Sequence, residues 1–264
     1  MSNTAVRTAL FIPLFDELSE PSVAIDIAVV AEAAGWDGVF VWDHMMYRPP
    51  VERIADPWTV MAAMAHATDR VVLGPMVTPI ARRRVQVLAR QTATLDRLSN
   101  GRLVFGVGLG GDPGGELSLF DEEMDAQVRA QLLDDGLEHI DRWWRGEETN
   151  GVQLLPQPVQ QPRIPIWVAS RFPNRAPVRR AARWDGWFPI GLTSPDDLVE
   201  QLAYAQQHRV ADAGPWDVAV QGLYDEDPAP WVGAGATWWL VRFEPFGLPA
   251  AHVLEVAEAG PPTR

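Results

Sequence analysis

The sequence contains no cysteine and no lysine, and each absence removes a group of chemistries. Without cysteine there is no disulfide, no thiolate nucleophile and no zinc–thiolate centre. Without lysine there is no Schiff-base aldolase. All 22 basic residues are therefore arginine, and 35 acidic residues give a net charge of −13. This excess of negative charge argues against nucleic acid or an anionic membrane surface as a partner, because both require basic patches.

Motifs of common hydrolases are also missing. The five histidines form neither an H-x-H nor an H-E-x-x-H motif, so we predict no metal site, and no G-x-S-x-G motif occurs. The apolar runs are shorter than the ~18 residues that a membrane span requires. The first run, residues 9–14, is too short for a signal peptide and contains Pro13. We therefore expect a cytoplasmic protein.

Short apolar runs alternate with amphipathic segments along the chain. The predicted strands are residues 8–14, 38–42, 71–77, 103–107, 164–169, 186–190, 217–221 and 238–242. Such β–α alternation implies a parallel sheet with right-handed crossovers. The chain has 264 residues, close to the ~250 typical of a closed barrel. The sequence thus predicts an α/β fold, a (β/α)8 TIM barrel that forms one domain over residues 1–264.

Turn and cap signals refine this prediction. Ser19, Asp56 and Ser194 are predicted N-caps of helices, because their side chains can accept from free backbone N–H groups. Residues 146–163 carry several turn signals and no helical period, so we interpret them as an excursion that includes a small hairpin. Only residues 222–237 separate the last two strands, which predicts a shortened seventh helix. Residues 113–123 are long for a strand–helix connection and are a candidate lid.

The best candidate for chemistry is Asp43-His44, directly after the second predicted strand. In barrels of this kind, active sites lie at the C-terminal ends of the strands. Adjacent side chains point to opposite faces, so the two residues cannot form a dyad with each other. One of them could anchor a ligand while the other handles protons near neutral pH. The alternative is structural: Asp43 caps a turn and His44 packs under the loop.

Other strand ends carry weaker signals. Thr78-Pro79 ends the third predicted strand. The exit Gly106-x-Gly108-x-Gly110-Gly111 lacks dinucleotide-binding spacing, but it would let backbone N–H groups approach a ligand, unless it is only a flexible loop. Ser170-Arg171 and Gly191 follow the fifth and sixth strands, although phosphate sites of barrels usually follow strands seven and eight.

Two further groups of residues have open interpretations. Arg82, Arg83 and Arg84 open a helix whose N-terminus is already positive, which is unfavourable without nearby anions. They form either a solvated or intersubunit face paired with acids, or a clamp for the acidic tail of a cofactor. Most of the 12 tryptophans are expected in the core. Trp42, Trp58 and Trp187 are the ones that we expect near a pocket.

Four segments together resemble the bacterial luciferase-like monooxygenase superfamily. They are EAAGWDGVFVWDH (32–44), LGPMVTPIARRR (73–84), LARQTATLDRLSNGRLVFGVGLGGD (88–112) and IPIWVASRFPNRAPVRRAARWDGWFP (164–189). The superfamily includes FMN-dependent monooxygenases and oxidoreductases that use the deazaflavin coenzyme F420. The resemblance implies a (β/α)8 barrel with the cofactor ring at its C-terminal mouth. It also implies a homodimer formed through the helices of residues 57–68 and 84–98.

The resemblance also assigns roles to residues. It implies that Asp43 contacts the cofactor ring and that His44 is the catalytic proton donor or charge stabiliser. Met76-Val77 falls where the family often has a non-proline cis peptide bond against the ring, with Thr78 following. The remaining cofactor-binding residues that it implies are Gly108, Leu109 and Gly110 along the ring, and Ser170, Arg171 and Gly191 on the phosphate side.

Taken together, the sequence predicts an oxidoreductase that uses coenzyme F420 for hydride transfer with an unidentified small organic substrate. One alternative is an FMN-dependent monooxygenase supplied with reduced flavin by a partner reductase. Another, from a different class, is a flavin-binding protein without catalysis, and a third is a barrel isomerase or lyase without a redox cofactor. The sequence departs from some deazaflavin members, which have small residues where Ser170-Arg171 stands. It also lacks the lysines that bind substrate phosphate in the sugar-phosphate dehydrogenases of the family.

Overall fold

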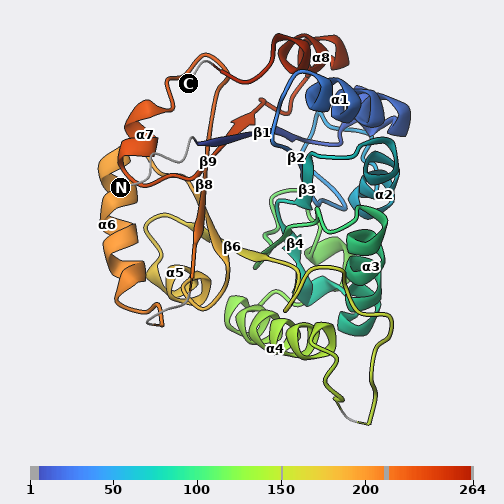
Figure 1. Ribbon diagram of the computed structural model, residues 1–264, viewed down its shortest axis with the longest axis vertical. Helices are drawn as coiled ribbons and strands as arrows, with labels where there is room; N and C mark the ends of the chain where they lie inside the picture. Colours follow the sequence, from blue (N-terminus) through green and yellow to red (C-terminus); the bar gives the residue numbers. More distant parts are fainter. Residues whose placement is uncertain (1–5, 150, 211–213, 263–264) are drawn as a thin grey trace.

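The protein is described by a computed structural model, which covers residues 6–149, 151–210 and 214–262. The chain alternates strand and helix around a parallel sheet, with the helices outside it (Figure 1). The strands are β1 (Arg7–Ile12), β2 (Gly38–Val41), β3 (Val72–Pro75), β4 (Thr78–Pro79), β5 (Phe105–Gly108), β6 (Ile166–Arg171), β7 (Gly186–Ile190), β8 (Asp217–Gly222) and β9 (Trp238–Arg242). The helices are α1 (Pro21–Ala33), α2 (Pro57–Ala67), α3 (Val85–Leu98), α4 (Ala126–Trp144), α5 (Arg175–Ala181), α6 (Pro195–Gln206), α7 (Ala229–Gly233) and α8 (Ala250–Ala259).

The strand order within the described residues is β3-β2-β1-β9-β8-β7-β6-β5-β4. The two ends of this order are parts of one barrel strand, because β3 and β4 follow each other and only Met76-Val77 separates them. A parallel bridge between Leu73 and Leu103 ties β3 to the chain just before β5. The sheet is therefore a nearly closed α/β barrel, as predicted, although the predicted third strand is divided in two.

Alternation along the strands creates two separate cores. One fills the inside of the barrel and includes Phe40, Trp167, Phe188 and Trp238. The other lies between the sheet and the helices. Strands buried on both faces explain why these segments read as continuous apolar runs rather than as alternating ones.

The predicted helix starts are confirmed in two cases and wrong in one. Asp56 accepts from the backbone N–H of Thr59 at 2.8 Å, and Ser194 forms a capping box with Asp197. Ser19 is not a cap, because Glu20 holds the N-cap position of α1 and the Ser19 hydroxyl donates to the Asp16 carbonyl. No helix in the described part of the chain combines the length and the hydropathy that crossing a membrane requires.

The two irregular regions also match their predictions. Residues 146–163 contain no helix among those described, and an isolated antiparallel bridge joins Thr149 to Val152. The segment packs along α3, where the buried Asp96 accepts from the backbone N–H groups of Val159 and Gln160. The seventh helix, α7, is only five residues long, and none of its side chains is fully buried.

Candidate functional site

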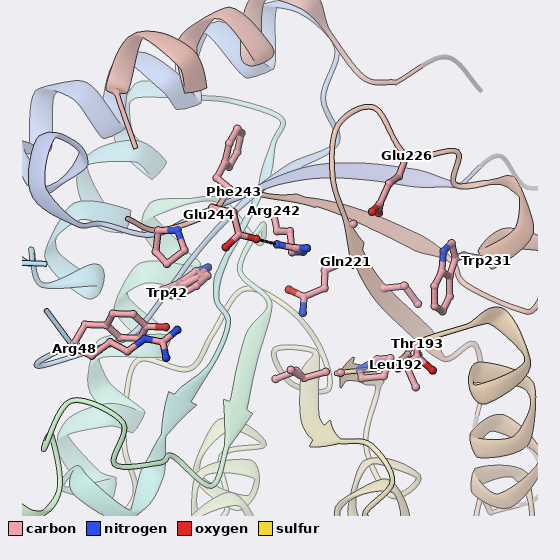
Figure 2. Close-up of a pocket in the computed structure, with 17 residues that line it drawn as sticks. Trp42, Arg48, Leu192, Thr193, Gln221, Glu226, Trp231, Arg242, Phe243 and Glu244 are labelled. Carbon is pink, nitrogen blue, oxygen red and sulfur yellow. Dashed lines mark hydrogen bonds and ion pairs between the residues drawn. The ribbon is translucent and has the colours of Figure 1, made fainter. Parts of the chain in front are cut away.

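A cavity of about 480 Å³ opens at the C-terminal ends of β7, β8 and β9, beside the end of β2. Its volume falls within the range of small-molecule sites, ~300–1,000 Å³. Figure 2 shows the side chains that surround it. The lining residues are Trp42, Tyr47, Arg48, Pro189, Ile190, Gly191, Leu192, Thr193, Val220, Gln221, Gly222, Glu226, Trp231, Arg242, Phe243, Glu244 and Pro245.

The floor of this cavity follows from strand alternation. Phe40, Phe188, Ala219 and Leu240 belong to the core inside the barrel. Successive side chains along a strand point to opposite faces, so the residues two positions further on share this inner face. Those residues are Trp42, Ile190, Gln221 and Arg242, and all of them line the cavity.

Arg242 and Gln221 supply hydrogen-bond donors that the sequence analysis did not single out. They come from adjacent strands, and both project into the cavity in Figure 2. The Arg242 guanidinium forms an ion pair with Glu244, and its side chain is 32% exposed. The signal that could have found them is their place at the ends of the seventh and eighth barrel strands, where barrels often bind phosphate.

Asp43 lies beside the cavity rather than in it, and its carboxylate is fully enclosed. Oδ1 accepts from Arg82 at 2.9 Å and from Arg83 at 2.7 Å. Oδ2 accepts from the Thr78 hydroxyl at 2.7 Å and from the Trp58 indole at 3.3 Å. Both oxygens are thus occupied by the protein itself. The predicted contact between Asp43 and a cofactor ring stays a prediction.

For the first two members of the arginine run, the expected pairing with acids is found, but the expected solvated face is not. The Arg82 side chain is 4% exposed and the Arg83 side chain 17% exposed, and both turn inward to Asp43. They are neither a solvated face nor a clamp open to a ligand. Only Arg84 is exposed. The anions that make this placement favourable are buried carboxylates of the same chain.

Glu116 is the functional candidate that the sequence analysis missed. Its side chain is 2% exposed, and its carboxylate bonds His44 Nδ1 at 3.0 Å and Arg82 Nη1 at 2.6 Å. Burial acts to raise the pKa of Glu116, but the hydrogen bond and charge of His44 together with Arg82 outweigh it and leave this pKa below its usual value. Glu116 therefore stays ionised at neutral pH. Its only sequence signal was a position inside the candidate lid.

His44 is the most accessible member of this ionic cluster, with a side chain 23% exposed. Its ring lies 5.0 Å from the Tyr47 ring and 5.8 Å from the Trp42 ring, centroid to centroid. Trp42 and Tyr47 both line the cavity, so the imidazole adjoins the cavity wall. Its bond to the buried Glu116 is compatible with the structural alternative as well, so the catalytic role of His44 stays a prediction.

The glycine-rich exit of β5 is explained by close packing with the neighbouring strand. A Cβ added to Gly106 would lie 2.0 Å from the Pro75 carbonyl oxygen, and one on Gly108 would lie 2.6 Å from Val77 Cγ2. A Cβ on Gly110 would lie 2.9 Å from Pro79 Cβ. The Met76–Val77 peptide bond on the facing segment is cis, as the resemblance implies. We call Gly106, Gly108 and Gly110 the glycine seam. Its predicted contact with a cofactor remains a prediction, as it does for Met76, Val77, Thr78 and Leu109.

On the predicted phosphate side, Ser170 and Arg171 face opposite ways. Ser170 accepts from the Trp187 indole at 2.7 Å and is 4% exposed, so its hydroxyl points away from the barrel interior. Arg171 is exposed, and its Nη1 lies 3.8 Å from the position of a Cβ added to Gly191. Gly191 lines the cavity and has a φ of +79°. Arg171 and Gly191 together therefore present a cation and an open backbone at the cavity edge.

Of the three tryptophans expected near a pocket, the expectation is confirmed for Trp42, which lines the cavity. The other two do not line this cavity and lie between the sheet and the helices. Trp58 packs against Phe105, and Trp187 stacks on Trp216 at 5.9 Å. The Trp58 indole N–H donates a hydrogen bond to Asp43, and the Trp187 indole N–H donates one to Ser170.

Comparison with known proteins gives consistent matches. The sequence profile of a family described as luciferase-like monooxygenase matches residues 11–224. An F420-dependent glucose-6-phosphate dehydrogenase of Microbacterium testaceum is 30% identical over 208 residues, which are 74% of this chain and 60% of that protein. The oxygenase component of the flavin-dependent trigonelline monooxygenase of Acinetobacter baylyi is 31% identical over 175 residues, 61% of this chain and 44% of that protein. The chain thus spans less than two thirds of the length of these curated relatives.

A solved structure extends the match to the whole fold. The coenzyme F420-dependent tetrahydromethanopterin reductase of Methanopyrus kandleri superposes with a TM-score of 0.75 over 98% of this chain and 99% of that one. Its sequence identity of 15% restricts this likeness to the fold.

Proposed function

The chain belongs to the luciferase-like monooxygenase family, whose members are F420- and flavin-dependent oxidoreductases, and from this premise we propose that it uses coenzyme F420 to oxidise or reduce a small organic substrate. The observation that carries the choice of cofactor is the similarity to F420-dependent dehydrogenases over 74% of the chain. When bound, the coenzyme would supply hydride transfer, and the protein supplies binding, orientation and proton handling.

Three features of the site fit such a cofactor. Arg171 and Gly191 offer a cation and an open backbone for a phosphate-bearing tail. The Trp42 indole nitrogen is buried at the cavity wall without a hydrogen-bond partner, so a polar group of a ligand would satisfy it. The inner-face residues Ile190 and Trp42 provide an apolar surface for a planar ring.

The part of the cavity at the ends of β8 and β9 is the proposed substrate site. Arg242 and Gln221 would orient the substrate through their N–H groups, while Trp42 and Trp231 would exclude water. His44 would exchange the proton that accompanies oxidation or reduction of an oxygen-bearing carbon. These proposed roles consist of positioning the substrate and transferring a proton, and the side chains for both are present at the mouth of the barrel.

An FMN-dependent monooxygenase is the second candidate. It is favoured by the 31% identity to the oxygenase component of a flavin-dependent monooxygenase. This candidate would require a partner reductase to supply reduced flavin. We also propose a homodimer through α2 and α3, where Val87 and Leu98 expose half or nearly half of their side chains, at 50% and 44%. A monomer in light scattering at micromolar concentration would contradict the dimer.

A parallel titration of the purified protein with oxidised F420 and with FMN tests the choice of cofactor. Tryptophan quenching and cofactor fluorescence would report binding. We expect tight binding of F420 and weak or no binding of FMN; the opposite preference would overturn the proposal in favour of the monooxygenase. Binding of neither would refute both candidates.

Two matched variants locate the tail of the cofactor. Arg171→Ala should weaken binding about 10- to 100-fold, the effect of losing one hydrogen bond to a charged group. Arg179→Ala removes an exposed arginine of α5 and should leave the affinity unchanged. Equal affinities of the two variants would place the tail elsewhere.

A further inference from the structure

The two carboxylate oxygens of Glu116 have different surroundings. Oε2 accepts from Arg82 Nη1 at 2.6 Å and from the backbone N–H of Met45 at 3.1 Å. Oε1 faces His44 Nδ1 at 3.0 Å. One oxygen is therefore fixed by two donors that cannot give up their protons, and the other is directed at the imidazole.

The position of the proton between Glu116 and His44 follows from the chemistry of the two groups. Glu116 stays ionised because its pKa is lowered, and its carboxylate faces both His44 and Arg82. An ionised carboxylate can only accept hydrogen bonds. The proton between Glu116 and His44 must then reside on Nδ1, so an imidazole that carries a single proton has its lone pair on Nε2.

We propose that Glu116, oriented by Arg82, is a positioning residue that selects the Nδ1–H tautomer of His44 and so makes Nε2 the atom that exchanges protons at the barrel mouth. This inference rests on the proposed function only in giving His44 a part in the reaction. The tautomer itself is a property of the protein without any cofactor.

The segment of residues 113–123 carries Glu116 and therefore holds it next to His44. Asp112 Oδ1 accepts from the backbone N–H groups of Leu117 at 2.7 Å and Ser118 at 3.1 Å, which folds the segment over itself. Leu117, next to Glu116, is 2% exposed. The segment is thus seated on the barrel through buried residues, and it delivers the acid that orients His44.

Replacing Glu116 by glutamine should invert the tautomer rather than merely weaken the bond. In Glu116→Gln the amide oxygen is needed where Oε2 stood, because Arg82 and the Met45 N–H both require an acceptor there. The amide NH2 then occupies the position of Oε1 and donates to His44 Nδ1. His44 must accept at Nδ1 and carry its proton on Nε2.

Two-dimensional ¹H–¹⁵N correlation across the imidazole rings distinguishes the tautomers directly. Full-length protein with ¹⁵N-labelled histidine would be recorded at a pH where the rings are neutral, and His44→Ala would identify the His44 signals among the five histidines. We expect Nδ1–H in the wild type and Nε2–H in Glu116→Gln. Glu123→Gln, the same change at an exposed position of the same segment, should leave Nδ1–H in place.

An Nε2–H tautomer in the wild type would overturn the proposal, even if Glu116→Gln failed to fold. An unchanged Nδ1–H tautomer in a folded Glu116→Gln would overturn it as well, with the other four histidine signals serving as the test of folding. When a substrate that the enzyme turns over is available, Glu116→Gln should lower kcat by about 10²- to 10⁴-fold, the usual contribution of general acid–base catalysis. Its cofactor affinity should stay at the wild-type value. Failure of F420 binding would refute the proposed function and leave the tautomer result standing.

Discussion

The two sides of the barrel mouth treat charge in opposite ways. Around β2 and β4, the carboxylates of Asp43 and Glu116 are 0% and 2% exposed, and each bonds an arginine. Around β8 and β9, Arg242 is 32% exposed and its partner Glu244 is 72% exposed. We call these the closed side and the open side. The closed side satisfies its own charges, whereas the open side leaves donors directed at a cavity.

From this difference we expect the closed side to contribute stability and the open side to contribute ligand binding. A buried charge that loses its partner is expensive, whereas a solvated ion pair contributes little to folding. Groups of the closed side can therefore be oriented accurately without a ligand. Groups of the open side remain free to change partners when a substrate enters.

Removing Arg82 should have the largest effect on stability. Arg82→Ala leaves Glu116 buried without its cation and takes one of two cations from Asp43. We expect a loss of about 3–5 kcal/mol in the free energy of unfolding, measured by urea denaturation. The neighbouring exposed Arg84→Ala is the control and should change it by less than about 0.5 kcal/mol. Similar losses in both variants would contradict the distinction between the sides.

The closed side should also respond to acid through Glu116. Its lowered pKa means that its ionised form stabilises the fold above the pKa of the unfolded chain, about 4.3, and that this contribution is lost as the pH falls through that value towards the folded pKa. At pH 7, Glu116→Gln should be less stable than wild type by about 1.5–3 kcal/mol. Denaturation between pH 7 and pH 3.5 should show this difference shrinking. A difference independent of pH would show that the charge of Glu116 is not responsible.

The glycine seam extends the closed side down the sheet. Gly106→Ala would place a Cβ against the Pro75 carbonyl and Met76 Sδ, at 2.0 and 2.7 Å. We expect a loss of about 1–3 kcal/mol from overpacking, again measured by denaturation. Gly233→Ala is the matched control, since a Cβ there meets nothing within 4 Å. It should be neutral or slightly stabilising.

The smallest effect on stability is expected on the open side. Arg242→Ala removes a partly exposed ion pair and should change the free energy of unfolding by less than about 1 kcal/mol. The variant should nevertheless have a lower turnover than wild type, which can be measured once a substrate is identified, because the guanidinium projects into the cavity. A large loss of stability would show that the open side is as fixed as the closed one.

Much of the fold was predictable because a barrel repeats its signals. Every strand is a short apolar run, and sites lie where such runs end, which was enough to find Asp43 and His44. The sequence could not show which face of these runs points inward, since both faces are buried. For WWLVR, residues 238–242, that uncertainty concealed Arg242 at the cavity floor.

The ionic cluster was not predictable for a different reason. Glu116 is 34 residues from Arg82 and 72 from His44, and only closure of the sheet brings them together. When the partners are that far apart in the sequence, charged residues in a loop or at the start of a helix are predicted to be exposed to solvent. The glycine seam was also hard to interpret from the sequence. Its glycines are required because Pro75 and Val77 approach them closely, and these residues precede β5 in the chain by about 30 residues.

The five-residue helix α7 has a use in protein engineering. None of its side chains is fully buried, although Trp231 and Val232 pack against the core, and a Cβ at Gly233 would meet nothing within 4 Å, so an insertion after Gly233 has open space. Trp231, two residues earlier, lines the cavity. A fluorescent reporter inserted after Gly233 would therefore lie two residues from the cavity wall, a position from which it could report the binding of a ligand.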